Sequence, residues 1–192
     1  MNKIKLGYAI CGSFCTFSKA IEQIETLKNS DYDIYPVFSE FAYKTDTRFY
    51  KADEYVKSVE NICQKKSIST IYDAEPIGPK KLFDIMIIAP CTGNTLGKLA
   101  LGITDTSVTM AAKAHLRNNK PLVIGISSND SLSTSAKNIG ILLNRRNVYF
   151  VPFGQDDSVS KPRSMVCDFN KISETISSAL KGEQIQPLIL GC

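Results

Sequence analysis

The sequence has 192 residues, of which 43% are hydrophobic and 22% are charged, and its 23 basic and 19 acidic residues give a formal net charge of +4. A chain of this length is expected to form one domain, because most domains contain about 100 to 200 residues. The basic residues are spread along the chain. This argues against a surface that binds nucleic acid or membranes, since such a surface needs a clustered basic stripe.

The amino-terminal segment combines two lysines with an apolar run, a pattern that superficially resembles a secretory signal peptide. Gly7 and Gly12 interrupt the run and a helical pattern follows it at once, so we expect a strand here and not a signal peptide. No stretch approaches the roughly 20 apolar residues that a membrane-spanning helix requires. The six cysteines form no CxxC pair and the chain has one histidine, so no metal site is expected, and the scattered thiols are typical of a reducing cytoplasm.

Short β-like runs alternate with helical patterns along the whole chain. The predicted strands are residues 4–10, 33–38, 84–90, 121–127 and 147–153, and the predicted helices are residues 17–29, 53–65, 95–103, 108–119, 132–144 and 169–182. This alternation predicts the α/β class, with a doubly wound parallel sheet in a three-layer α/β/α sandwich. We expect one domain over residues 1–192 that ends in a helix. The long polar stretch at 154–163 is expected to be a mobile surface loop, a lid or a partner-binding arm.

Glycine, hydroxyl and amide residues follow three of the predicted strands. They are Gly12 and Ser13 after the first strand, Ser39 after the second, and Thr92, Gly93, Asn94 and Thr95 after the third. Ligands of open parallel sheets bind beyond the carboxyl ends of the strands, and free N–H groups at helix starts attract anions. Ser, Thr and Asn are also favoured helix caps. The pattern therefore predicts either a cradle for an anionic ligand or a set of simple caps.

The segment APCTGNTLGKLALGITDT (residues 89–106) resembles the turn and trailing helix of the homo-oligomeric flavin-containing cysteine decarboxylase superfamily. CGSFCTF (residues 11–17) is similar to the glycine–serine turn of that superfamily, and Ser39 matches its hydroxyl residue after strand two. The resemblance implies a Rossmann-like flavoprotein fold, FMN bound at the three turns, and a homo-oligomer.

Within this superfamily, the chain looks most like the B subunits of bacterial enzymes that form pyridine-2,6-dicarboxylate (dipicolinate), through runs that include AKNIGILLN, VYFVPFGQDD and KPRSMV. That resemblance implies an oxidoreductase subunit that acts on a dihydro- or hydroxytetrahydro-dipicolinate during sporulation, in the cytoplasm of the mother cell of a spore-forming bacterium. It also implies a partner A subunit that binds NAD(P). It leaves open whether this chain keeps FMN and which of the two chains carries the chemistry.

Two features depart from the decarboxylase pattern. The catalytic histidine of those enzymes precedes the third strand, where this chain has Pro76 or Ile77. Their Pro-x-Met-Asn turn after the fourth strand corresponds here to residues 126–129, in which Asn129 alone is retained. His115, near a helix end, is expected to be a surface or capping residue. An FMN-dependent decarboxylase or prenyltransferase is thus the second interpretation, and a non-catalytic subunit that binds an anion or flavin is the third.

A dicarboxylate ligand needs cations, and arginine suits bidentate recognition of a carboxylate. Lys161 and Arg163, in the predicted loop, are the main candidates for contact with substrate or with the A subunit, beside Lys137 and Arg145. Solvated surface charge would explain all four equally well.

Three cysteines, Cys11, Cys15 and Cys91, follow predicted strands and are expected to lie close together. A helix amino terminus lowers the pKa of a nearby thiol and makes it reactive. Buried cysteine, however, commonly packs as a small apolar residue, so both interpretations stay open.

Overall fold

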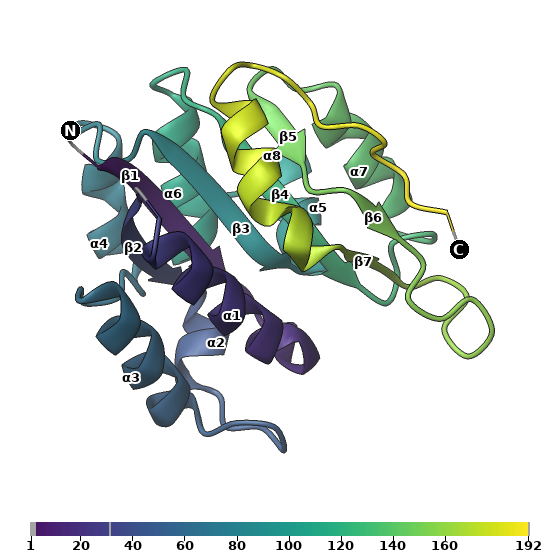
Figure 1. Cartoon of the computed structure of the whole chain (residues 1–192), viewed down its shortest axis with the longest axis horizontal. Helices are drawn as coiled ribbons and strands as arrows, with labels where there is room; N and C mark the ends of the chain where they lie inside the picture. The colour runs from purple at the N-terminus through teal and green to yellow at the C-terminus, as the bar shows by residue number, and fades with distance from the viewer. Residues whose placement is uncertain (1–2, 31, 192) are drawn as a thin grey trace.

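The computed structural model describes residues 3–30 and 32–191 and contains a seven-stranded sheet between two layers of helices (Figure 1). The strands are β1 (Ile4–Ile10), β2 (Tyr32–Phe38), β3 (Ile85–Cys91), β4 (Leu122–Ser128), β5 (Val148–Phe150), β6 (Phe153–Gly154) and β7 (Met165–Cys167). Their order is β2-β1-β3-β4-β7-β6, and β5 also pairs with β4. Strands β1 to β5 are parallel, whereas β7 runs antiparallel to both β4 and β6. The predicted α/β class and mostly parallel sheet are therefore confirmed.

Helices cover both faces of the sheet, as predicted. They are α1 (Phe17–Lys28), α2 (Glu40–Lys44), α3 (Ala52–Cys63), α4 (Ile71–Ala74), α5 (Gly93–Leu101), α6 (Ser107–Leu116), α7 (Ala136–Leu143) and α8 (Ile172–Ala179), with short 3₁₀ turns at Phe14–Thr16, Glu75–Ile77 and Phe169–Lys171. Helices α1, α3 and α8 form one layer, and α4, α5, α6 and α7 form the other (Figure 1). None of the helices in the described part of the chain is long and apolar enough to span a membrane.

The central strand β3 explains why the sheet needs two helical layers. All seven of its residues are buried, and its apolar side chains alternate between the two faces. A strand that is apolar on both sides is stable only when both faces are covered. Gly7 on β1 contributes to this packing, because a Cβ there would lie 2.5 Å from the ring of Phe83.

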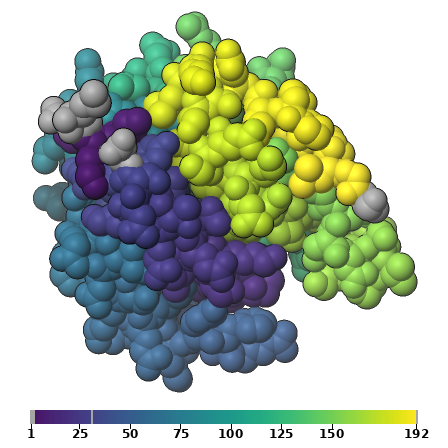
Figure 2. Space-filling model, viewed as in Figure 1, coloured from purple at the N-terminus to yellow at the C-terminus, as the bar shows by residue number. Residues whose placement is uncertain are grey.

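The predicted strand 147–153 is wrong in its extent, because the structure divides it at Pro152. Strand β5 ends at Phe150, and Pro152 has no N–H to donate to a neighbouring strand. The chain then turns into β6, which pairs antiparallel with β7. The loop between β6 and β7, predicted as a long polar stretch, projects from the body of the molecule (Figure 1). Figure 2 shows the surface hollowed between this loop and the start of α1.

His115 is neither a surface residue nor the cap of its helix, contrary to the prediction. The residue is 1% exposed, and its ring packs beside Phe83 and bonds to the carbonyl oxygen of Pro121 at 2.9 Å. A carbonyl can only accept, so the neutral ring carries its proton on Nε2. The alanines of α6 are also buried, so they pack in the core of this chain.

Candidate functional site

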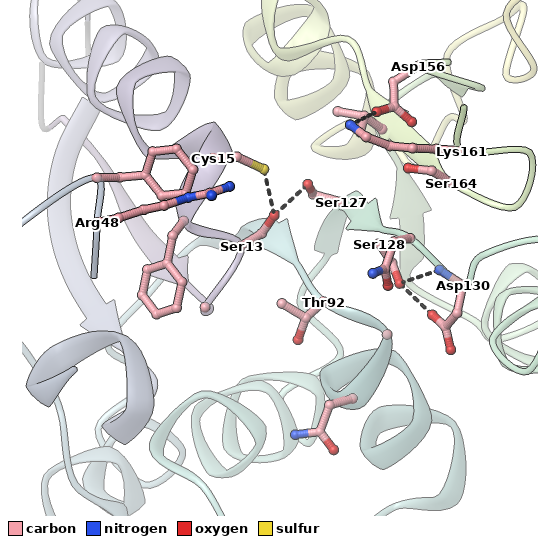
Figure 3. Close-up of a pocket in the computed structure, with 17 residues that line it drawn as sticks. Ser13, Cys15, Arg48, Thr92, Ser127, Ser128, Asp130, Asp156, Lys161 and Ser164 are labelled. Atoms are coloured by element: carbon pink, nitrogen blue, oxygen red, sulfur yellow. Dashed lines mark hydrogen bonds and ion pairs between the residues drawn. The ribbon is translucent and has the colours of Figure 1, made fainter. Parts of the chain in front are cut away.

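A cavity of about 750 Å³ lies beyond the carboxyl ends of β1, β3 and β4 (Figure 3). Its volume falls in the range of about 300 to 1,000 Å³ that is usual for small-ligand pockets. Eight residues singled out in the sequence line it: Gly12, Ser13, Cys15, Thr92, Gly93, Asn94, Asn129 and Lys161. The cavity therefore lies where the rule for open parallel sheets predicts a ligand.

Five other predicted binding residues lie outside the cavity lining: Ser39, Thr95, Lys137, Arg145 and Arg163. Ser39 accepts the backbone N–H of Ala42 at 3.2 Å and so caps α2. Thr95 is buried and donates to the sulfur of Cys11 at 3.3 Å. Arg163 donates to the hydroxyl of Ser133 at 3.3 Å.

Aromatic rings fill the space beside the turn after β1. A Cβ on Gly12 would lie 2.8 Å from the ring of Phe41 and 3.5 Å from that of Phe14. The two rings contact each other with centroids 5.6 Å apart. Gly12 is thus required for the close approach of Phe41, and the turns after β1 and β2 do not open onto one shared cradle.

A pair of hydroxyl groups joins β1 to β4 inside the cavity. Ser13 Oγ and Ser127 Oγ are 2.7 Å apart, and Figure 3 shows both between Cys15 and Ser128. One hydroxyl donates to the other, so the pair keeps one hydroxyl hydrogen for a further acceptor. Ser127 was missed in the sequence, although it lies at the end of a central strand.

A carboxylate occupies the amino-terminal end of α5. Asp130 Oδ1 accepts hydrogen bonds from the hydroxyls of Ser128, at 2.5 Å, and Ser135, at 2.9 Å. A Cβ on Gly93 would lie 2.5 Å from the same oxygen, so only glycine admits the carboxylate here. A negative charge at a helix amino terminus is favourable. Asp130 therefore already neutralises part of the positive potential that the start of α5 was predicted to offer to an anionic ligand.

Two cations reach the cavity from opposite sides. Lys161, from the loop between β6 and β7, pairs with Asp156 at 3.4 Å. Arg48, from the segment between α2 and α3, extends over the ring of Phe49 at 4.7 Å from its centroid. Arg48 was not predicted, because nothing in the local sequence distinguishes it from a solvated arginine.

The buried thiols are less acidic than ordinary cysteines, not more acidic as one interpretation of the sequence supposed. Burial raises the pKa of Cys11 to about 11, against weaker opposing hydrogen bonds from Thr95 and Thr92. Burial also raises the pKa of Cys91 well above its usual value. Cys15 is exposed at the cavity, with its sulfur 4.0 Å from Ser13 Oγ. Only Cys15 of these three is therefore accessible to a reagent.

We expect Cys15 to react with Ellman's reagent much faster than the four buried thiols at about pH 8, because attack requires an accessible thiolate. Cys15→Ser should remove this fast reaction. Cys192 lies outside the described residues, so the comparison is made in a Cys192→Ser background. An unchanged fast reaction in the Cys15→Ser variant would contradict the assignment.

The chain has relatives among known proteins along nearly its whole length. The sequence model of the family described as Flavoprotein matches residues 1–181. The B subunit of dipicolinate synthase from Bacillus subtilis (strain 168) is 43% identical over 186 residues, which are 97% of this chain and 93% of that protein. The crystal structure of the corresponding B subunit from Bacillus halodurans C has a TM-score of 0.90 at 39% identity and covers 100% of this chain and 99% of its own. The crystal structure of the FMN-dependent cysteine decarboxylase SpaF has a TM-score of 0.67 at 18% identity, with 94% and 98% covered, and shares the fold alone.

Proposed function

Because this chain belongs to the Flavoprotein family, we propose that it acts as the B subunit of a dipicolinate synthase, together with an NAD(P)-dependent A subunit. The observation that carries this proposal is the 43% identity to the B subunit of a dipicolinate synthase over 97% of the chain. The substrate would be a dihydro- or hydroxytetrahydro-dipicolinate, and the site of action the cytoplasm of a sporulating mother cell.

The cavity supports a small anionic ring as ligand. Its walls combine the cations Arg48 and Lys161 with the apolar rings of Phe14 and Phe49. Cations suit carboxylates, and aromatic rings suit a flat ring between them. A pyridine dicarboxylate or its reduced precursor has both features.

The residues present also fit FMN. The cavity is large enough for a small ligand, and Arg48, Ser13 and Asn94 offer donors for a phosphate and a ribityl chain. Asp130 offers an acceptor for a ring N–H. When bound, a flavin would supply a hydride acceptor, while the protein would supply orientation and electrostatics.

A flavin-dependent decarboxylase or prenyltransferase stays the second interpretation. His115, the sole histidine of the sequence, is not among the residues that line the cavity, and it bonds instead to Pro121 before the start of β4. Pro76 and Ile77, at the place of the decarboxylase histidine, lie in a separate surface depression. A decarboxylase would therefore have to work without an imidazole in this cavity.

We further propose a homo-oligomer. Leu101 and Ile103 at the end of α5, and Ile141 and Leu143 on α7, are 41% to 72% exposed. Helices α5 and α7 contact each other, so these apolar side chains belong to neighbouring elements. A second copy covering them would remove apolar area from water.

The test is reconstitution of dipicolinate formation with the A subunit of the same organism. We expect product only when both chains are present, and no release of carbon dioxide from cysteine-containing substrates by this chain alone. Equal product from the A subunit without this chain would refute the proposal. Carbon dioxide release by this chain alone would favour the decarboxylase instead.

A further inference from the structure

Arg48 lies on the segment between α2 and α3, which is held in a defined turn. Thr47 Oγ1 accepts hydrogen bonds from the backbone N–H groups of the two residues that follow Arg48, each at 3.2 Å. On the other side, Asp46 accepts the backbone N–H of Ala52 at 2.9 Å. The backbone on both sides of Arg48 is therefore fixed by side chains.

The charge of Arg48 is not neutralised within residues 3–30 and 32–191. No carboxylate of these residues lies within ion-pair distance of its guanidinium, which contacts the Phe49 ring. Lys161, the other cation of the cavity, is paired with Asp156. Arg48 thus keeps its planar set of N–H donors for a ligand.

The guanidinium of Arg48 points across the cavity toward Ser13 and Ser127 (Figure 3). The two serines are bonded to each other at 2.7 Å and keep one hydroxyl hydrogen to donate. A cation and a neutral donor therefore face the same end of the cavity.

Opposite Arg48, the cavity lining has two carboxylates, Asp130 and Asp156, and one cation, Lys161, which is paired with Asp156. Asp130 lies against Gly93 at the start of α5, where a ligand anion would otherwise be attracted. A second anion close to this carboxylate would be repelled. An anionic group of a ligand is consequently most favourable at the Arg48 end of the cavity.

We propose that Arg48, with the Ser13–Ser127 hydroxyl pair, is the subsite for the anionic group of a planar ring ligand. The choice of ligands rests on the proposed function, whereas the subsite rests on the geometry of the cavity. A carboxylate and a phosphate share the chemistry that arginine recognises, two oxygens that accept parallel N–H donors. The ring carboxylate of a pyridine dicarboxylate and the phosphate of FMN are the two sources.

The test is calorimetric titration of the purified chain with pyridine-2,6-dicarboxylate and, separately, with FMN. For whichever anion binds the wild type, Arg48→Ala should weaken binding about 10- to 100-fold, because bonds to charged groups are worth that much. Arg48→Lys keeps the charge without the planar donors, so its affinity for the anion should lie between those of the wild type and Arg48→Ala. Lys51→Ala on the same turn is the matched control: its ammonium is engaged by Asp46 at 2.9 Å, so binding should not change.

Uncharged analogues identify the source of the anion. Arg48→Ala should leave the binding of riboflavin and of pyridine unchanged, since neither has the anionic group. A loss confined to FMN assigns the subsite to phosphate, and a loss confined to the dicarboxylate assigns it to carboxylate. Three results would overturn the proposal. Wild type and Arg48→Ala could bind the anion with equal affinity, the variant could lose as much affinity for riboflavin as for FMN, or the wild type could bind neither anion. Arg48-dependent binding without turnover beside the A subunit would refute only the proposed function.

Discussion

Replacing Gly93 with alanine is expected to lower the free energy of unfolding by about 1 to 3 kcal/mol, the usual cost of overpacking. The new Cβ would lie 2.5 Å from Asp130 Oδ1, 2.7 Å from Ser135 Oγ and 2.8 Å from Ser128 Oγ. These three groups bond to one another, so none can move away without breaking a hydrogen bond. Urea unfolding should show a lower midpoint with an unchanged slope.

The chain offers a matched control for Gly93→Ala. Gly140, inside α7, has no atom within 4 Å of an added Cβ, and Gly140→Ala should stabilise the protein by about 0.5 to 1 kcal/mol. In an Asp130→Ala background, Gly93→Ala should lower the free energy of unfolding by a smaller amount, because the nearest clashing atom is absent. Equal stabilities of the two glycine variants would show that the Asp130 cluster is not rigid.

Lowering the pH from about 7 to about 5 should reduce the free energy of unfolding by about 2 kcal/mol through His115. Burial is the largest cause that lowers the pKa of His115, from 6.5 to about 4, and the bond to Pro121 opposes it only partly. The unfolded chain therefore takes up a proton near pH 6.5 that the folded chain refuses until about pH 4. The contribution of His115 to stability is fully retained above about pH 6.5, falls between these values and levels off below about pH 4.

His115→Gln isolates this effect. Glutamine does not titrate, and its amide can still donate to the carbonyl oxygen of Pro121. In urea unfolding, the variant should therefore not show the loss of about 2 kcal/mol in the free energy of unfolding that His115 causes between about pH 7 and pH 5. Because the chain contains one histidine, no other imidazole contributes. The same pH dependence in both proteins would rule out His115 as its origin.

The parallel strands could be predicted from the sequence because burial on both faces leaves a continuous apolar run, as in residues 85–89. Strands β6 and β7 could not be predicted, because two and three residues are too few to show an apolar pattern. Strand β7 has three residues and pairs with Ser127 and Ser128 of β4. The helix predicted from residue 132 begins only at Ala136, because the backbone N–H groups of Ser133 and Ser135 bond to the carbonyl oxygen of Asp130 in a turn.

The position of the cavity was predictable, but the directions of its side chains were not. A hydroxyl residue after a strand serves equally well as a cap, as Ser39 does, or as part of a cavity wall, as Ser13 does. The polar run from Ser127 to Asp130 follows β4 and could have been found by the same rule that was applied to the other strands. Arg48 could not have been found in this way, since only the folding of a distant segment brings it to the cavity.

The hydrogen bond between Ser13 and Ser127 joins residues that are 114 positions apart. On a ribosome that adds roughly 5 to 20 residues per second, Ser127 is made on the order of 10 s after Ser13. Strand β1 also lies between β2 and β3, so its second neighbour appears only after residue 85. The nascent chain thus carries Phe14 and Cys15 without the opposite wall of the cavity until β4 has been synthesised. Any ligand binding in this cavity consequently has to wait for the synthesis of β4, because the growing amino-terminal half of the chain provides only one of its walls.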